Sequence, residues 1–526
     1  MFSRVLSAVT AGLEARLIWV EADVSQGLPG FSVIGDVNVQ VREAEIRVRT
    51  ALKNSGISLP PRRITVNLAP AGIRKEGTAF DLPMAAAVLA SCGELPSGAP
   101  ESCLVLGELG LDGSLGPVPG ILPMVHLARE EGVRRCVVPW ENVPEALLAE
   151  GMDVIGVRNL QEFLQVCRGK CPRPFSAAGG GAFRIPGKKE GSEGEGSKET
   201  GWEEDCDFSE LRGQEGLKRA ALLAAAGFHN LLLIGPPGSG KTMIARRLPT
   251  ILPRMTREES LEVTRIYSVA GLLPEGDPLI RRRPFRAPHH SLSPQALAGG
   301  GRIPRPGEVT LAHRGVLFLD ELPEMARRNL ELLRQPLEER KILISRQGGS
   351  YSFPADFLFA AAMNPCPCGF YPDMSRCTCT DSQVLRYQRK LSQPLLDRID
   401  ICGEALPVSY RELMGDGEKG MDSAGMRALV EEARKIQARR YAGEGILFNS
   451  QLSPAQIKKY CRATPRGEKL LELAFGEMGL SPRACHRIRR VARTAADLEG
   501  SEVIEARHMG EAISLRSLDK KYWRGI

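Results

Sequence analysis

The sequence predicts an α/β protein in which a parallel-sheet core follows an α+β domain and precedes an all-helical domain. Continuous apolar runs of strand length, at 231–234, 315–319 and 357–362, alternate with helical segments. Runs of this kind are typical of a parallel sheet covered by helices on both faces. Shorter alternating runs before residue 169 indicate mixed strands and helices, and beyond residue 420 only helical periodicity is found.

Composition excludes several classes of protein. The 526 residues are 43% hydrophobic and 25% charged, which is ordinary for a globular chain and rules out global disorder. The formal net charge of +7 permits nucleic-acid binding without requiring it. The 13 cysteines in so long a chain favour a reducing compartment. With neither a signal peptide nor an apolar membrane span in the sequence, we expect a cytoplasmic protein with no membrane partner.

Two breaks divide the chain. Residues 169–206 are rich in Gly, Ser, Glu and Lys, which predicts a flexible linker, although an ordered surface loop is the alternative. A second break falls near 415–420. We therefore expect domains at 1–168, 207–415 and 416–526. Within the first, strands are expected at 16–24, 30–34, 63–68 and 104–106, and helices at 40–54 and 82–91.

The most specific motif is GPPGSGKT at 235–242, which fits G-x-x-x-x-G-K-[ST] between a predicted strand and a helix. Backbone N–H groups of such a loop face phosphates, so ATP and Mg²⁺ are the expected cofactors. Lys241 is expected to reach the β- and γ-phosphates and Thr242 to bind the metal. The whole segment is the predicted nucleotide site: Gly235, Pro236, Pro237, Gly238, Ser239, Gly240, Lys241 and Thr242.

Polar residues follow the next two predicted strands. Asp320 and Glu321 end the run 315–319, and we expect Asp320 to hold Mg²⁺ and Glu321 to polarise the attacking water. The alternative is a solvated acidic pair at a helix N-terminus. Asn364 ends the strand at 357–362 and is expected to bond the γ-phosphate or the attacking water.

Four further segments complete a family resemblance: RPFRAPHHSLS at 283–293, AAMNPCPCG at 361–369, PLLDRID at 394–400, and residues 481–498. Together with the phosphate motifs they resemble the YifB/ComM family of Mg-chelatase-like AAA+ ATPases over essentially the whole chain. That resemblance implies a hexameric ring and DNA branch migration, a helicase activity, in natural transformation. The related chelatase subunit implies an alternative, the remodelling of a protein partner for metal insertion. A nucleotide-gated scaffold is the non-enzymatic reading.

The same resemblance assigns two arginines. Arg398 stands where ring ATPases carry an arginine finger, which acts on a neighbouring subunit and so implies a homo-oligomer. A local pair with Asp397 or Asp400 is the alternative. Arg483 resembles the sensor-2 arginine of a helical lid, although other arginines lie close by in the sequence.

The N-terminal domain resembles the Lon-protease fold. Ala79 stands in the place of the nucleophilic serine and Leu122 in that of the catalytic lysine, so no acyl-enzyme can form. Lys75 and Thr78 do not make a substitute pair. We expect an inactive domain that binds a protein partner or helps assembly.

Four cysteines form a separate cluster, with Cys366 and Cys368 followed by Cys377 and Cys379. Four thiolates within 14 residues suit a tetrahedral Zn²⁺ site. Four reduced surface thiols or an iron–sulfur cluster are the alternatives.

The resemblance implies a DNA partner, single-stranded or branched, and the basic residues are candidates for contacting it. Residues 421–526 hold 20 Lys and Arg against 13 Asp and Glu. On a helix, Arg483, Arg487 and Arg490 share one face, with Arg489 and Arg493 alongside, and that face is suited to phosphates or simply solvated.

Between the two phosphate motifs lie further candidates for DNA contact. They are the basic stretch 281–286 and a flexible insert at 299–302. A third candidate lies beyond the second motif, before the strand at 357–362: a hairpin at 345–353 that presents Arg346 or Tyr351. We expect His289 and His290 to be structural or to face phosphate rather than to bind metal.

Overall fold

The computed structural model describes residues 2–96, 102–169, 206–274, 276–302, 304–346, 349–406, 420–516 and 522. The chain divides into two compact units. One comprises Met1–Thr200, Arg257–Ile280 and Arg302–Arg305, and the other comprises the remainder. The linker predicted at 169–206 lies outside the described residues except for its two end positions, as does nearly all of the break at 415–420.

The first unit is built on a seven-stranded mixed sheet with the order β3-β4-β2-β1-β5-β8-β9. Its strands are β1 (Phe2–Ala11), β2 (Glu14–Ser25), β3 (Gly30–Ile34), β4 (Arg63–Ala69), β5 (Cys103–Val105), β8 (Arg135–Pro139) and β9 (Asp153–Val157). Its helices include α1 (Val39–Asn54), α2 (Asp81–Ser91), α3 (Ile121–Glu130), α4 (Val143–Ala146) and α5 (Leu160–Cys167), and β6 (Glu108–Leu109) pairs with β7 (Leu115–Gly116). The strands and helices expected from the sequence are confirmed, whereas β1, β8 and β9 were not foreseen.

Helix α8 (Arg257–Ala270) belongs to this first unit although it follows the phosphate-loop helix in the chain. It packs on α3, and the Gly120 N–H donates to the Ser268 carbonyl over 3.0 Å. The Ser268 hydroxyl and the Leu122 N–H both donate to the buried carboxylate of Glu145. A segment between two nucleotide motifs is thus part of the first unit.

The second unit contains a five-stranded, wholly parallel sheet in the order β11-β12-β15-β10-β16. Its strands are β11 (Phe285–Arg286), β12 (Val316–Leu319), β15 (Leu358–Met363), β10 (Leu231–Ile234) and β16 (Ile401–Glu404). Every residue of β10, β12 and β15 is buried, which explains their uninterrupted apolar sequences. The predicted parallel sheet is confirmed.

Short elements complete this core. They are α6 (Glu215–Gly227), α7 (Lys241–Ile251), α9 (Pro294–Ala298), α10 (Glu308–Leu311), α11 (Arg327–Leu332), α12 (Arg334–Glu339), α13 (Asp381–Gln388) and α14 (Gln393–Leu396). The hairpin expected at 345–353 is confirmed and is longer, with β13 (Lys341–Arg346) paired to β14 (Gly349–Pro354).

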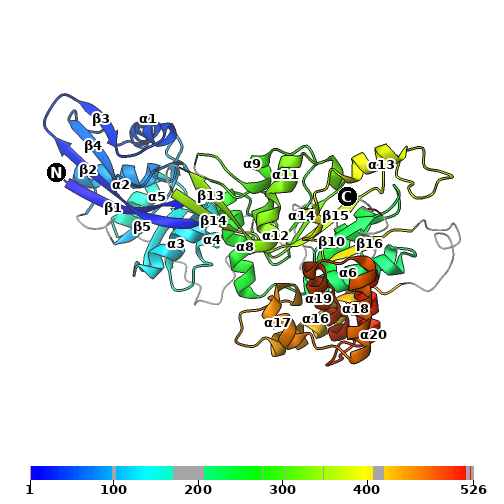
Figure 1. Cartoon of the computed structure of the whole chain (residues 1–526). Coiled ribbons are helices and arrows are strands. Elements are labelled where there is room, and N and C mark those ends of the chain that lie inside the picture. Colours follow the sequence, from blue (N-terminus) through cyan, green and yellow to red (C-terminus); the bar gives the residue numbers. More distant parts are fainter. Residues whose placement is uncertain are drawn as a thin grey trace. The chain divides into compact units, whose positions relative to one another are not determined.

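The residues described from 420 to 516 form the predicted all-helical region (Figure 1). Its helices are α16 (Ser423–Arg440), α17 (Pro454–Tyr460), α18 (Pro465–Met478), α19 (Pro482–Leu498) and α20 (Ala506–Ser514). Three of them begin at a Ser-Pro or Thr-Pro step whose hydroxyl caps the first turn, namely Ser453, Thr464 and Ser481. Because α16 and α19 pack on α6, the helical region and the sheet share one hydrophobic core. None of the helices in the described ranges has the length and apolar character needed to cross a membrane.

Candidate functional site

The phosphate loop joins β10 to α7. Gly238 (φ +75°) and Gly240 (φ +85°) occupy left-handed conformations that favour glycine, and Gly240 caps α7. The Lys241 ammonium is buried and donates to the carbonyls of Gly235 and Pro236, each over 2.8 Å. Burial lowers the pKa of Lys241, and the charge of Asp320 partly opposes that shift. The loop therefore wraps around the Lys241 side chain and ends at the N-terminus of α7. Backbone N–H groups at a helix N-terminus bind phosphate.

The acidic pair follows β12, two strands away in the same sheet. The Thr242 hydroxyl donates to Asp320 Oδ2 over 2.8 Å, and Asp320 and Glu321 are both exposed. A hydroxyl and a carboxylate side by side offer the hard oxygen ligands that Mg²⁺ prefers, so the residues present fit this ion.

Asn364 follows β15, the strand between the other two. Its Oδ1 accepts a hydrogen bond from Lys241 Nζ over 3.2 Å. Because parallel strands end at one edge of the sheet, β10, β12 and β15 bring the loop, the acids and Asn364 together there.

Two neighbours of this site were not foreseen. His290 Nδ1 lies 3.5 Å from Glu321 Oε2, although the sequence offered no reason to pair them. Gln214 precedes α6 and donates from Nε2 to the carbonyl of Ser239 over 3.2 Å. No motif marks Gln214, because its contact depends on where α6 lies.

Arg398 and Arg483 lie at the opposite edge of the sheet. They line a cavity of about 550 Å³ together with Asn230 and Asp400, which directly precede β10 and β16. The phosphate loop leaves the other end of β10, and four strand residues span about 13 Å. The structure therefore does not bring these two arginines to the phosphate loop of the same chain.

Arg398 has partners within its own chain. Its guanidinium pairs with Glu338 and donates to the carbonyls of Arg334 and Pro394. Among the described contacts of Arg398 there is no local pair with Asp397 or Asp400, the alternative to an arginine finger. Asp400 instead lies 3.6 Å from Arg487 Nε and 3.7 Å from His229 Nδ1.

Charge dominates the surroundings of Asp400. Burial by itself raises the pKa of this carboxyl, but the contact with His229 and the charges of Arg487 and Arg490 bring the pKa well below its usual range. Burial lowers the pKa of Arg487 to about 10. The cavity thus gathers more positive than negative side chains: Arg340, Arg398, Arg483, Arg487, Arg490, Glu338 and Asp400.

The basic face predicted on α19 is only partly available. Arg483, Arg487 and Arg490 all line the cavity, and Arg483 is exposed. Arg489 is bound by Glu468 through two hydrogen bonds, of 2.6 and 2.7 Å.

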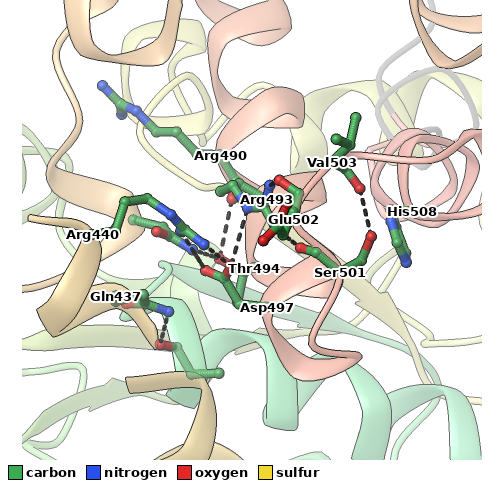
Figure 2. Close-up of polar contacts among 12 residues, drawn as sticks. Gln437, Arg440, Arg490, Arg493, Thr494, Asp497, Ser501, Glu502, Val503 and His508 are labelled. Atoms are coloured by element: carbon green, nitrogen blue, oxygen red, sulfur yellow. Dashed lines mark hydrogen bonds and ion pairs between the residues drawn. The ribbon is translucent and has the colours of Figure 1, made fainter. Parts of the chain in front are cut away.

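Arg493, by contrast, belongs to the interior. Figure 2 shows it pointing toward Asp497 together with Arg440, and Asn449 also donates to that carboxylate. Arg493 is fully buried. It holds the helical region together and is not placed to meet phosphates.

The arginines of the basic stretch and of the hairpin also differ in how exposed they are. Arg283 donates to the carbonyls of Pro253 and Arg314, and Arg286 makes a two-bond pair with Glu308, so both are half-buried and bound within the chain. Arg346 is exposed on the hairpin and donates to the carbonyl of Gly301 over 3.2 Å, which joins the hairpin to the predicted insert.

The four cysteines lie together. The sulfurs of Cys366, Cys368, Cys377 and Cys379 are all within 4.8 Å of one another. Individual sulfur–sulfur distances of 3.3, 3.5 and 3.8 Å exclude disulfides among those pairs and resemble the spacing of about 3.8 Å expected for thiolates around a single zinc ion.

In the first unit, Ala79 and Leu122 are both buried. The Lys75 ammonium is bound by the Pro70 carbonyl, and the Thr78 hydroxyl by Glu108. The Lys75 ammonium and the Thr78 hydroxyl thus bond to different groups and do not form a pair.

Three family profiles match the chain. "Magnesium chelatase, subunit ChlI" matches residues 207–413, "Subunit ChlI of Mg-chelatase" matches 20–142, and the ChlI C-terminal profile matches 420–516. The match at 20–142 lies in the α+β part, the match at 207–413 contains the parallel sheet, and the match at 420–516 is the helical region.

Relatives match over nearly the full length. Competence protein ComM of Haemophilus influenzae is 40% identical over 517 residues, which cover 98% of this chain and 97% of ComM. YifB of Escherichia coli is 39% identical over 523 residues, covering 98% of this chain and 97% of YifB. The DNA repair protein RadA of Escherichia coli is 27% identical over 167 residues, which are 30% of this chain and 35% of RadA.

The family of these relatives implies ATP and Mg²⁺ as ligands, which agrees with the residues gathered at the carboxyl edge of the sheet. The chain belongs to the ComM/YifB family of Mg-chelatase-like AAA+ ATPases.

Proposed function

We propose that this chain is an ATP-hydrolysing ring motor that moves along or remodels DNA, as a helicase or branch-migration factor in recombination or natural transformation. One observation supports the proposal of a ring. The phosphate loop lies at one edge of the sheet, and Arg398 and Arg483 line a cavity at the opposite edge. Lys241 of one copy holds ATP, and arginines of the next copy complete that ATP site. The active form is therefore a homo-oligomer, which we propose is a hexamer.

Each residue at the carboxyl edge has a role in the proposed reaction. Lys241 releases its loop carbonyls and donates to the β- and γ-phosphates. Glu321 accepts a proton from the attacking water, and Asn364 orients that water or the γ-phosphate. When bound, Mg²⁺ neutralises charge on the phosphate oxygens, and Thr242 and Asp320 are the residues that would hold it.

The proposed arginine finger has to leave its own chain's partner. Arg398 now pairs with Glu338, whose side chain is 58% exposed and therefore well screened by solvent. A triphosphate carries more negative charge than one carboxylate, so the neighbour's nucleotide competes successfully for the guanidinium.

DNA is the proposed substrate for two reasons. The relatives that match include a competence protein and a DNA repair protein. In addition, the hairpin β13–β14 presents the exposed Arg346 beside Gly301, a position suited to a phosphate backbone. Chelatase-type remodelling of a protein partner is the second candidate, favoured by the ChlI profiles.

ATP hydrolysis with and without single-stranded, duplex and forked DNA, at two salt concentrations, separates the two candidates. We expect strong stimulation that weakens with salt, because phosphate contacts release counterions. Arg346→Ala should reduce this stimulation, whereas Lys341→Ala, at the other end of the same strand, should not. Hydrolysis that no DNA alters would favour the chelatase-type function instead.

A complementary test addresses hydrolysis itself. Glu321→Gln should retain ATP binding and lose steady-state hydrolysis, because an amide cannot accept the proton of the attacking water. An unchanged rate in this variant would contradict the proposed role of Glu321.

We also propose that residues 1–168 form a Lon-protease-like domain that binds a protein partner and has no protease activity. Buried Ala79 and Leu122 support this proposal, since neither supplies a nucleophile or a base. Cleavage of unstructured peptide substrates by the purified chain would contradict it.

We further propose that the cysteine cluster binds Zn²⁺. A single ion with four thiolate ligands matches the sulfur spacing, whereas the ligands of an iron–sulfur cluster bind different iron atoms and lie further apart.

A further inference from the structure

The loop that carries the four cysteines, residues 365–380, packs directly on the phosphate loop. A Cβ built on Gly369 would lie 2.5 Å from Cδ and 3.3 Å from Cγ of Pro237. Gly369 also has φ +88°, a conformation that favours glycine. Backbone from the cysteine loop therefore supports the middle of the GPPGSGKT segment, with no room for a side chain between them.

The position of Gly369 depends on the cysteines. Its N–H donates to Cys366 Sγ over 3.2 Å, and the Tyr371 N–H donates to the same sulfur over 3.4 Å. Cys366 is buried, and its sulfur lies 3.3 Å from that of Cys368 and 3.8 Å from that of Cys377. A bound ion would hold these sulfurs together and so would fix the backbone that touches Pro237.

The other end of the cysteine loop also reaches the nucleotide site. Asn364, which accepts from Lys241, lies two residues before Cys366. The intervening Pro365 carbonyl accepts a hydrogen bond from Gln388 Nε2 of α13 over 3.2 Å. The loop thus contacts the phosphate site through both Asn364 and Gly369.

We infer that this four-thiolate site is a metal-dependent support of the phosphate loop: a single thiophilic divalent ion, Zn²⁺, keeps Pro237 and Asn364 in the geometry that binds ATP. The inference rests on the proposed ATPase function and adds a control on its nucleotide site. Loss of the ion frees the cysteine loop, and the phosphate loop then loses the packing of Gly369 on Pro237.

The test compares metal content and nucleotide binding in the full chain. Zinc is measured by mass spectrometry, the affinity for a fluorescent ATP analogue by titration, and folding by circular dichroism. We expect about one zinc per chain in the wild type and none in Cys377→Ser/Cys379→Ser. The affinity of that double variant should fall about tenfold, the scale on which outer contacts of a metal site act. Cys92→Ser, in the first unit, is the matched thiol control and should match the wild type in both readouts.

A second pair of variants separates support from metal binding. Gly369→Ala places a methyl group against Pro237 and should lower nucleotide affinity while most of the zinc remains bound. Gly443→Ala has a similar positive φ, of +81°, with nothing within 4 Å of the added carbon, so it carries the same backbone strain without the contact. It should bind nucleotide normally.

Several outcomes would overturn the inference. They are a wild-type chain without zinc, a zinc-free folded chain with unchanged nucleotide affinity, or equal effects of the two glycine variants. If the double cysteine variant fails to fold, Gly369→Ala and removal of zinc from the wild type by a chelator still decide the question. Failure of the proposed DNA motor shows itself differently, as hydrolysis without DNA stimulation and with zinc-dependent nucleotide binding intact.

Discussion

His290 Nδ1 lies 3.5 Å from Glu321 Oε2, and this contact joins the loop before α9 to the residue proposed to activate water. Glu321 has φ +48°, in the left-handed region that a residue with a side chain rarely adopts. Its carboxylate is 58% exposed, so little else restrains it. The ring of His289 lies against that of His290, with centroids 4.0 Å apart and planes tilted by 34°, which limits where His290 can turn. We interpret His290 as a positioning residue for Glu321.

Replacing His290 by alanine should therefore lower kcat roughly tenfold, less than the 10²–10⁴-fold contribution of a general base itself. ATP affinity should change little, because His290 contacts the carboxylate rather than the phosphate loop. Steady-state hydrolysis and nucleotide titration measure the two effects. His290→Gln, which keeps a donor, should recover part of the rate, and His126→Ala in the first unit should have no effect.

Mixing two inactive variants tests the shared site. Arg398→Ala should lower hydrolysis by a factor on the order of 10³, as loss of an arginine finger does. Lys241→Ala should abolish ATP binding. When the two are mixed in equal amounts, random assembly leaves roughly a quarter of the interfaces with an intact loop facing an intact finger. Recovered hydrolysis is the expected result, and a mixture as inactive as its components would contradict a site shared between chains.

Arg493 should matter for stability rather than for DNA binding. Its removal in Arg493→Met leaves Asp497 buried, with Arg440 and Asn449 as its remaining side-chain partners among the described residues (Figure 2). Breaking a buried pair on one side costs about 3–5 kcal/mol in the free energy of unfolding. Denaturant titration measures this change.

Arg489→Met is the matched control on the same helix. Its pair with Glu468 is partly exposed, so the expected loss is below about 1 kcal/mol. A larger loss for Arg489→Met than for Arg493→Met would contradict the interpretation.

Glu145 should make stability depend on pH. Burial is the main cause that raises the pKa of this carboxyl, and hydrogen bonds from Ser268, Leu122 and Asn142 oppose it only in part. A pKa that is higher in the folded state contributes stability that is fully present below the unfolded value of about 4.5 and is lost as pH rises through the folded value. The variant Glu145→Gln does not titrate.

The melting temperature of the wild type should accordingly fall relative to that of Glu145→Gln as pH increases above about 4.5. Scanning calorimetry at several pH values measures the difference. A difference that stays constant with pH would show that Glu145 has the same pKa in both states.

Much of the nucleotide site followed from local sequence. GPPGSGKT after an apolar run specifies a loop between a strand and a helix, since glycine is needed where φ is positive and lysine where the loop turns inward. Asp320, Glu321 and Asn364 were expected because each ends a buried strand, and parallel strands end at a common edge. The cysteine spacing likewise predicts a cluster, and the four sulfurs do lie together.

Contacts between distant segments could not be predicted in this way. The partners His290 and Glu321 are 31 positions apart and carry no shared periodicity, and Gln214 reaches Ser239 only because α6 lies beside the loop. The five arginines around α19 looked equivalent in the sequence. Packing separated them, because Arg493 lies in the part of α19 that is buried in the helical region, whereas Arg483 lies in the first turn of the helix and is exposed.

The fold class, the phosphate loop and the ends of the buried strands could be predicted from local sequence, and so could the cysteine cluster, because each depends on residues close together in the chain. Other relationships became apparent in the folded chain alone. Arg398 and Arg483 line the opposite edge of the sheet from Lys241, Gly369 packs on Pro237, and α8 joins the first unit. These relationships depend on strand order and on how helices pack, and the hydrophobic effect that drives packing acts on total buried surface rather than on any local motif.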